Sequence, residues 1–203
     1  MNPYPVDVQF EYGDGNRSRA FAVAGILFPI KLLMALPHIV VLYVIQIGAF
    51  IAGWFGFWAI AFTGSLPAGI ARFVHNSLGW QMRVSAWIAS MSDEYPGFAM
   101  EQPSYPAKVV ITEPTLERGR GLAVAGIIWF LKGILLFPHI IVLYFVGIAA
   151  VIAGWIAYWA IAFTGVYPDG IFRFVAGALR WATRTSAWLL SLTDEYPPFA
   201  LNN

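Results

Sequence analysis

The sequence contains no cysteine, and charged residues are scarce in it. The lack of cysteine excludes disulfides, thiol catalysis and metal or iron–sulfur sites with cysteine ligands. Asp, Glu, Lys and Arg make up only 11% of the 203 residues, whereas hydrophobic residues make up 59%. Such a composition is too apolar for a soluble domain of this size. We therefore expect a membrane protein whose first partner is the lipid bilayer, and no binding to nucleic acid.

The longest stretches without charge are two near-copies of one segment. Residues 37–64 read PHIVVLYVIQIGAFIAGWFGFWAIAFTG, and residues 138–165 read PHIIVLYFVGIAAVIAGWIAYWAIAFTG. Each exceeds the roughly 20 apolar residues that a helix needs to cross a bilayer. Both copies are therefore predicted to be membrane helices.

The rest of the chain repeats with the same spacing. A constant offset of 101 positions, which relates Tyr4 to Tyr105, also relates Trp58 to Trp159 without a gap. A repeat of about 100 residues indicates a duplicated domain and not a solenoid, whose repeats are about 20–50 residues long. We predict two membrane modules, residues 1–101 and residues 102–203.

Each module begins with a short strand, because apolar and polar residues alternate from Val6 to Tyr12. An isolated strand is unstable, so the copies at 6–12 and 107–112 should pair with each other or with the module ends. Apolar runs follow at 20–36 and 121–137. They stop at Pro37 and Pro138, where proline should break the helix before the long segment begins.

Mixed segments at 70–91 and 171–192 come next. Their bases fall on one helix face, which is typical of a helix lying in the membrane interface. The predicted fold is thus an all-α integral membrane protein of two tandem repeats. Each repeat has a short N-terminal strand, a two-helix transmembrane hairpin and an amphipathic interfacial helix.

The placement of basic residues predicts the topology. With two spans per module, ten bases lie on one side, and the positive-inside rule makes that side cytoplasmic. Both termini are then cytoplasmic. These bases are Arg17, Arg19, Arg72, Arg83, Lys108, Arg118, Arg120, Arg173, Arg180 and Arg184.

Small residues recur at every fourth position of the long segments, where they allow two helix backbones to approach closely. We predict that the two long helices pack against each other through them, about a two-fold axis along the membrane normal. The residues are Gly48, Ala52 and Gly56 in the first module and Ala149, Ala153 and Ala157 in the second.

Two ionisable pairs lie inside apolar segments. Lys31 with His38, and Lys132 with His139, are seven residues apart and share a helix face. An ionisable residue within a span is a candidate for a proton or ion path. The structural alternative is a lysine that reaches toward the interface and a histidine that caps the break. The structural reading is favoured, since a relay would normally include a carboxylate and the spans contain none.

The basic stripes also have two interpretations. Phosphate headgroups of anionic lipids could bind them, or they could pair with the acidic segments at 93–94 and 194–195. The stripe residues are Arg72 and Arg83 in the first module and Arg173, Arg180 and Arg184 in the second. No nucleophile–base pair, metal-ligand set or cofactor motif is evident, so we predict neither a catalytic site, a metal nor a cofactor.

Several motifs together resemble a bacterial family of small membrane proteins of unknown function. They are Pro-His, Phe-Thr-Gly-x-x-Pro-x-Gly, Arg-Trp-x-x-Arg and Asp-Glu-Tyr-Pro-Pro-Phe. The second module matches at Pro138, His139, 163–165, Pro168, Gly170, Arg180, Trp181, Arg184 and 194–199. In the first module Gly79 replaces the motif's first Arg, and Gly97 replaces its second Pro. The resemblance implies a bacterial inner membrane and no specific activity.

Two functions are compatible with these patterns. The leading hypothesis is a non-catalytic scaffold or accessory subunit that binds a membrane protein complex, a second copy of itself or anionic lipid at the cytoplasmic face. The alternative is a small transporter or channel with a path near Lys31 and Lys132.

Overall fold

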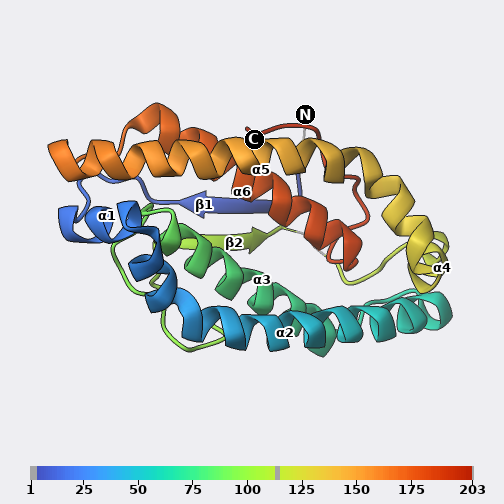
Figure 1. The fold of residues 1–203 in the computed structure, drawn as a ribbon. Coiled ribbons are helices and arrows are strands. Elements are labelled where there is room, and N and C mark those ends of the chain that lie inside the picture. Colours follow the sequence, from blue (N-terminus) through green and yellow to red (C-terminus); the bar gives the residue numbers. More distant parts are fainter. Residues whose placement is uncertain (1–3, 113–114, 203) are drawn as a thin grey trace.

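The computed structural model describes residues 4–112 and 115–202. Within these ranges the chain forms mainly helices and a small sheet (Figure 1). In chain order the elements are β1 (Val6–Phe10), α1 (Arg19–Ile26), α2 (Phe28–Thr63), α3 (Ala68–Ile88), β2 (Ala107–Ile111), α4 (Arg120–Ile127), α5 (Trp129–Thr164) and α6 (Asp169–Leu189). The prediction of a mostly helical chain built from two similar halves is confirmed.

The predicted helix break at the Pro-His pairs is wrong. Helix α2 continues through Pro37, and α5 continues through Pro138. The chain turns earlier instead, at Leu27 between α1 and α2 and at Ile128 between α4 and α5. The two-helix transmembrane hairpin is therefore wrong as well, because α1 and α4 have only 8 residues each. At 1.5 Å per residue such a helix extends about 12 Å.

The two prolines are tolerated because neighbouring groups bind the helix backbone beside them. Proline cannot donate to the carbonyl four residues earlier, which weakens the helix at that turn. The hydroxyl of Tyr95 donates to the carbonyl oxygen of Met34 over 2.8 Å, and that of Tyr196 donates to Leu135 over 2.6 Å. These acceptors are one residue after Leu33 and Ile134, whose carbonyls the prolines leave without a donor. The tyrosines therefore bind the weakened turn without replacing the missing hydrogen bond.

The long helices are apolar enough to lie in a membrane. Residues 30–63 and 131–164 meet the length and hydropathy of a membrane span. In the most apolar 18-residue stretch of each, however, only 22% and 11% is buried inside the protein. Large side chains such as Phe62 and Phe163 are about three-quarters exposed, at 74% and 75%. Most of the surface of α2 and α5 is therefore available to lipid.

The two modules exchange their short helices. Helix α1 packs on α5 of the second module, and α4 packs on α2 of the first. A Cβ atom added at Gly25 would lie 2.7 Å from the ring of Tyr158, and one at Gly126 would lie 2.8 Å from the ring of Phe57. The start of each module thus contacts the end of the other module's long helix. As a consequence α2 and α5 run in opposite directions (Figure 1).

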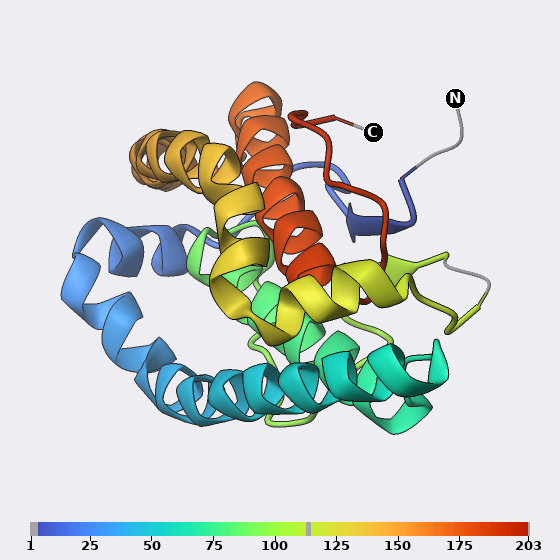
Figure 2. The same cartoon turned by 90° about the vertical axis from the view of Figure 1, so that its right-hand side faces the viewer.

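The strands pair with each other, as predicted. Strands β1 and β2 are antiparallel, with Val8 opposite Val109. Val6 and Val8 point into the core, and the sheet packs on α6 through β1 and on α3 through β2. Three layers result: the long helices, then α3 and α6, then the sheet. In Figure 2 the sheet and both termini lie on one side, and α1 with the start of α2 lies on the other.

The predicted contact between the two long helices is not formed through the small residues. Gly48 faces the ring of Phe73 in α3, and Gly56 faces Leu66 and Ile70. Ala149 is exposed, whereas Ala157 is buried in the shared core and Ala52 and Ala153 are partly buried. Figure 1 shows α3 and α6 between α2 and α5. The small residues of α2 therefore make room for the side chains of α3 and not for a second long helix.

Alanine at Gly25 or Gly126 should weaken the packing of α1 on α5 or of α4 on α2. The added methyl group would force the ring of Tyr158 or Phe57 to move, and overpacking of this kind costs about 1–3 kcal/mol. We expect a lower midpoint of thermal unfolding in mild detergent for either variant. Gly133→Ala is the matched control, because no atom lies within 4 Å of the added Cβ. An equal midpoint for all three variants would show that the glycines are not needed for close approach.

Candidate functional site

The lysine of the first long helix is bound to the end of α3. Lys31 is 3% exposed, and its Nζ donates to Ser90 Oγ over 2.5 Å. The same nitrogen lies 5.1 Å from the ring centroid of Trp87 and 4.9 Å from that of Tyr158. Tyr158 belongs to the other module. The ammonium group therefore joins α2, α3 and α5 at one point.

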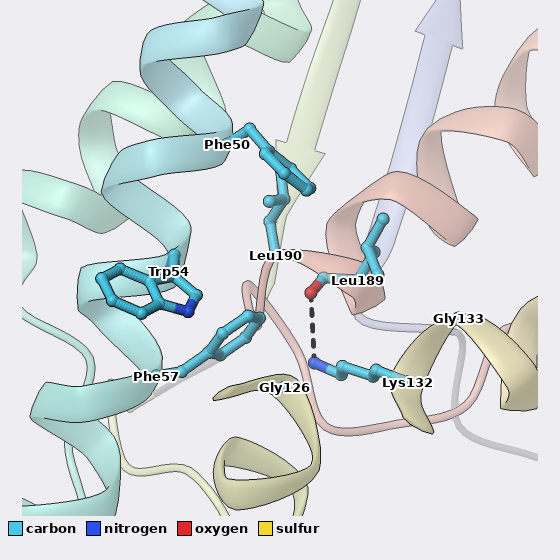
Figure 3. Close-up of a pocket in the computed structure, with 8 residues that line it drawn as sticks. All are labelled: Phe50, Trp54, Phe57, Gly126, Lys132, Gly133, Leu189 and Leu190. Carbon is cyan, nitrogen blue, oxygen red and sulfur yellow. Dashed lines mark hydrogen bonds between the residues drawn. The ribbon is translucent and has the colours of Figure 1, made fainter. Parts of the chain in front are cut away.

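Lys132 occupies the equivalent position at the end of α6. Its Nζ donates to the carbonyl oxygens of Trp188 and Leu189 over 2.7 and 3.3 Å, and to Ser191 Oγ over 3.0 Å. The nitrogen lies 5.0 Å from the ring centroid of Phe57 in α2. Figure 3 shows Lys132 reaching across a cavity of about 180 Å³ toward Leu189. The cavity is lined mainly by apolar side chains from α2 and from the end of α6.

We call Ser90–Met91 and Ser191–Leu192 the serine turns. Ser90 and Ser191 have φ angles of 54° and 58°, in the left-handed region that residues other than glycine rarely adopt. An arginine also binds each turn: Arg17 Nε donates to Met91 O over 3.0 Å, and Arg118 Nε donates to Ser191 O over 3.0 Å. A lysine and an arginine thus place positive charge just beyond the carbonyl end of each helix, where the helix dipole favours it.

The histidines are buried within a separate aromatic cluster. His38 has no exposed surface; its Nδ1 accepts from Trp80 Nε1 over 3.2 Å, and its ring stacks on Phe98 at 3.9 Å. The second module repeats this arrangement with His139, Trp181 and Phe199, at 2.9 and 3.8 Å. Each histidine therefore fixes the tail that follows α3 or α6 against the long helix. Lysine and histidine share a helix face, as the spacing predicts, but each has its own partners.

Three of the five stripe arginines bind backbone carbonyls. Arg83 donates to Ala99 O in the tail over 2.5 Å. Arg184 Nε donates to Val6 O over 3.1 Å, and Arg180 donates to Val8 O in the same strand. Arg180 and Arg184 also lie 2.8 and 3.4 Å from the carboxylate of Asp7. Burial lowers the pKa of Arg83 and of Arg184 below the usual arginine value.

The acids predicted as stripe partners have a different role. Asp93 accepts a bond from the backbone N–H of Ser18 over 2.7 Å, and Asp194 accepts one from Gly119 over 2.5 Å. They bind the chain just before α1 and α4. The sequence signal for the true arginine partners is weak, because any residue supplies a backbone carbonyl.

Arg72 and Arg173, the remaining stripe residues, are exposed. Arg173 pairs with Asp169 in the preceding turn of α6. Two further exposed bases, Arg19 and Arg120, were not singled out by the stripe pattern. Their guanidinium groups lie beside Gly165 and Gly64, at the ends of the long helices. Their equivalence under the 101-residue offset is the signal that could have identified them.

Comparison with known families shows to which family this chain belongs. The model of a domain of unknown function, DUF4389, matches twice, at residues 28–100 and 128–200. The chain therefore belongs to the DUF4389 family and contains two copies of the domain. No curated protein and no solved structure matches it. Among residues 4–112 and 115–202, no group of three or more His, Cys, Asp or Glu could hold a metal ion.

Replacing Lys132 by methionine should destabilise the protein. The change keeps an unbranched side chain but leaves the acceptors at Trp188 and Ser191 without their donor, which costs about 1–3 kcal/mol per unsatisfied buried group. We expect a clear decrease in the midpoint of thermal unfolding in detergent. Lys108→Met is the control, since Lys108 is partly exposed and lies 3.9 Å from Glu11. Equal midpoints for the two variants would contradict a structural role for Lys132.

The stripe arginines should separate into two groups. Arg184→Gln removes a buried guanidinium that binds β1, and the loss of hydrogen bonds to a charged group costs about 1.5–3 kcal/mol each. Arg173→Gln removes an exposed charge and should leave the unfolding midpoint unchanged. Retention of phosphatidylglycerol is measured in the same samples. The Arg173 variant should lose this lipid, and the Arg184 variant should keep it. Loss of that lipid in the Arg184 variant without loss of stability would restore the headgroup role predicted from the sequence.

Proposed function

We propose that this two-copy DUF4389 protein is a non-catalytic membrane scaffold that inserts into one leaflet and presents its sheet and tails to a partner complex at the cytoplasmic surface. In this arrangement each α1–α2 or α4–α5 pair dips into the hydrocarbon and returns to the same interface. The approximate two-fold axis between the modules then lies along the membrane normal.

The observation that carries this proposal is the composition of the turns at Leu27 and Ile128. A helix that crosses a bilayer must present a polar end to the water on the far side. The start of each long helix instead exposes apolar side chains: Leu27, Ile30, Ile128 and Leu131 are 53%, 47%, 44% and 38% exposed. A turn of this kind is more stable within hydrocarbon than in water.

The length of the short helices agrees with a dip of one leaflet. Eight residues extend about 12 Å, close to half of the roughly 30 Å hydrocarbon thickness. Arg19 and Arg120 begin these helices, and each lies beside the glycine that ends the opposite long helix. The polar start of each re-entrant segment therefore lies beside the end of the other segment.

The position of the sheet also favours insertion into one leaflet. In Figure 1 the two strands lie level with the middle of α2 and α5. If those helices crossed the bilayer, the open edges of a two-stranded sheet would lie at hydrocarbon depth, where unpaired backbone groups are very costly. Insertion from one side leaves the sheet and both termini in water.

The exposed bases suggest where anionic lipid binds. Arg19, Arg72, Arg120 and Arg173 are exposed, and a base near an anionic leaflet contributes about 1 kcal/mol. By the positive-inside rule, these bases favour the cytoplasmic face of a bacterial inner membrane. The transporter alternative has less support, because Lys31 and Lys132 donate to structural partners and Nδ1 of each histidine accepts from a tryptophan.

Cysteine accessibility tests this arrangement directly, since the chain has no cysteine of its own. Single cysteines in place of Glu11 or Glu117 should react with an impermeant thiol reagent only from the cytoplasmic side, in inverted vesicles. Leu27→Cys and Ile128→Cys should react from neither side until detergent is added. Reaction of either turn cysteine from the periplasmic side, in right-side-out vesicles, would show that the long helices cross the bilayer.

A further inference from the structure

We infer that the second module holds one acyl chain of a membrane phospholipid in a cavity between α5, α6 and the end of α3. The cavity has a volume of about 650 Å³, within the range of roughly 300–1,000 Å³ typical of ligand pockets. The inference rests on the proposed membrane insertion and adds a ligand to it.

The walls of the cavity suit a hydrocarbon chain. Gly147, Ala150 and Gly154 of α5 face Ala178 and Ala182 of α6, and none of the lining residues is Asp, Glu, Lys or Arg. Tyr158 also lines the cavity, but its hydroxyl already donates to the carbonyl oxygen of Ile88. The site can therefore recognise an apolar tail and not a charged headgroup.

The cavity opens on the part of α5 that is proposed to contact lipid. Val151, Ile152 and Trp155 line it and are also 69%, 54% and 46% exposed. No charged side chain lines this opening, so a chain from the surrounding bilayer can enter without crossing water. An empty apolar cavity of this size lacks packing contacts on its inner surface, which favours occupation by hydrocarbon.

The first module provides an internal comparison, because the same space is divided by its own side chains. Gln46 Nε2 donates to Gln81 Oε1 over 2.9 Å and closes the gap between α2 and α3. The ring of Phe50 lines both of the remaining voids, of about 430 and 180 Å³. By the 101-residue offset the largest differences in the lining are Gln46 for Gly147, Phe50 for Val151, Gln81 for Ala182 and Leu190 for Ala89. These larger side chains divide the space in the first module, whereas the second module keeps one continuous cavity.

Exchange of these residues between the modules gives a matched pair of variants. The closed variant carries Gly147→Gln, Val151→Phe, Ala182→Gln and Ala89→Leu, and the opened variant carries Gln46→Gly, Phe50→Val, Gln81→Ala and Leu190→Ala. Each is reconstituted with phosphatidylglycerol that bears a photoreactive group at the end of one acyl chain. Crosslinked peptides are then mapped by mass spectrometry, with carbonate extraction as a measure of membrane insertion.

The parent protein should crosslink mainly within residues 147–158, and the closed variant should lose this product while it remains in the membrane. The opened variant should gain crosslinks within residues 46–57, which keeps the test decisive if the closed variant does not fold. Unchanged crosslinking at 147–158 in the closed variant, or an opened variant without new crosslinks, would overturn the inference. Release of the parent by carbonate would instead contradict the proposed insertion.

Discussion

The fold depends on neutralising the carbonyl ends of α3 and α6 inside an apolar protein. The helix dipole places partial negative charge at these ends, which favours a positive charge nearby. At the serine turns Lys31 and Lys132 donate to the hydroxyls of Ser90 and Ser191, and Lys132 also donates to the last carbonyls of α6. Arg17 and Arg118 donate to the carbonyl oxygens of Met91 and Ser191, just beyond the two helices. Each lysine comes from a long helix, and each arginine comes from the segment just before a short helix. A single electrostatic requirement therefore fixes three separate segments of each module.

The same contacts make each module depend on the other for the enclosure of its buried lysine. The ring that covers Lys31 is Tyr158, and the ring that covers Lys132 is Phe57. Each lysine is thus enclosed only when the long helix of the other module is in place. Reciprocal exchange of this kind orients the long helices in opposite directions and brings the first strands together as an antiparallel pair. The hydrophobic core consequently contains residues from both copies.

The sequence predicts the local elements better than their partners. Alternation identifies β1, and the offset of 101 residues identifies the duplication and the equivalence of Lys31 with Lys132. The prediction fails at Pro37, where the helix continues and its weakened turn is bound by Tyr95, which is 58 positions away in the chain and shows no pattern that links it to Met34. It fails for Gly48 and Gly56 because small residues indicate close approach without indicating which helix approaches. The arginine stripe is misleading for the same kind of reason, since its buried members bind backbone carbonyls and the distant carboxylate of Asp7.

Differences between the copies show which parts of each contact are required. In the second module Arg180 donates to the carbonyl oxygen of Val8, whereas its equivalent in the first module is Gly79. The equivalent of Val8 is Val109, and its carbonyl oxygen is bound by His75 over 2.9 Å.

The charge beside the strand changes together with the donor. Asp7, which pairs with Arg180, is replaced by Lys108 at the position where the arginine is missing. A lysine beside two arginines would be repelled, so the loss of one arginine and the gain of Lys108 are physically linked. The two copies therefore share the backbone acceptor on the strand and differ in the side chain that satisfies it. The requirement imposed by the fold is a donor at that carbonyl, and its chemical identity follows from the charges that surround it.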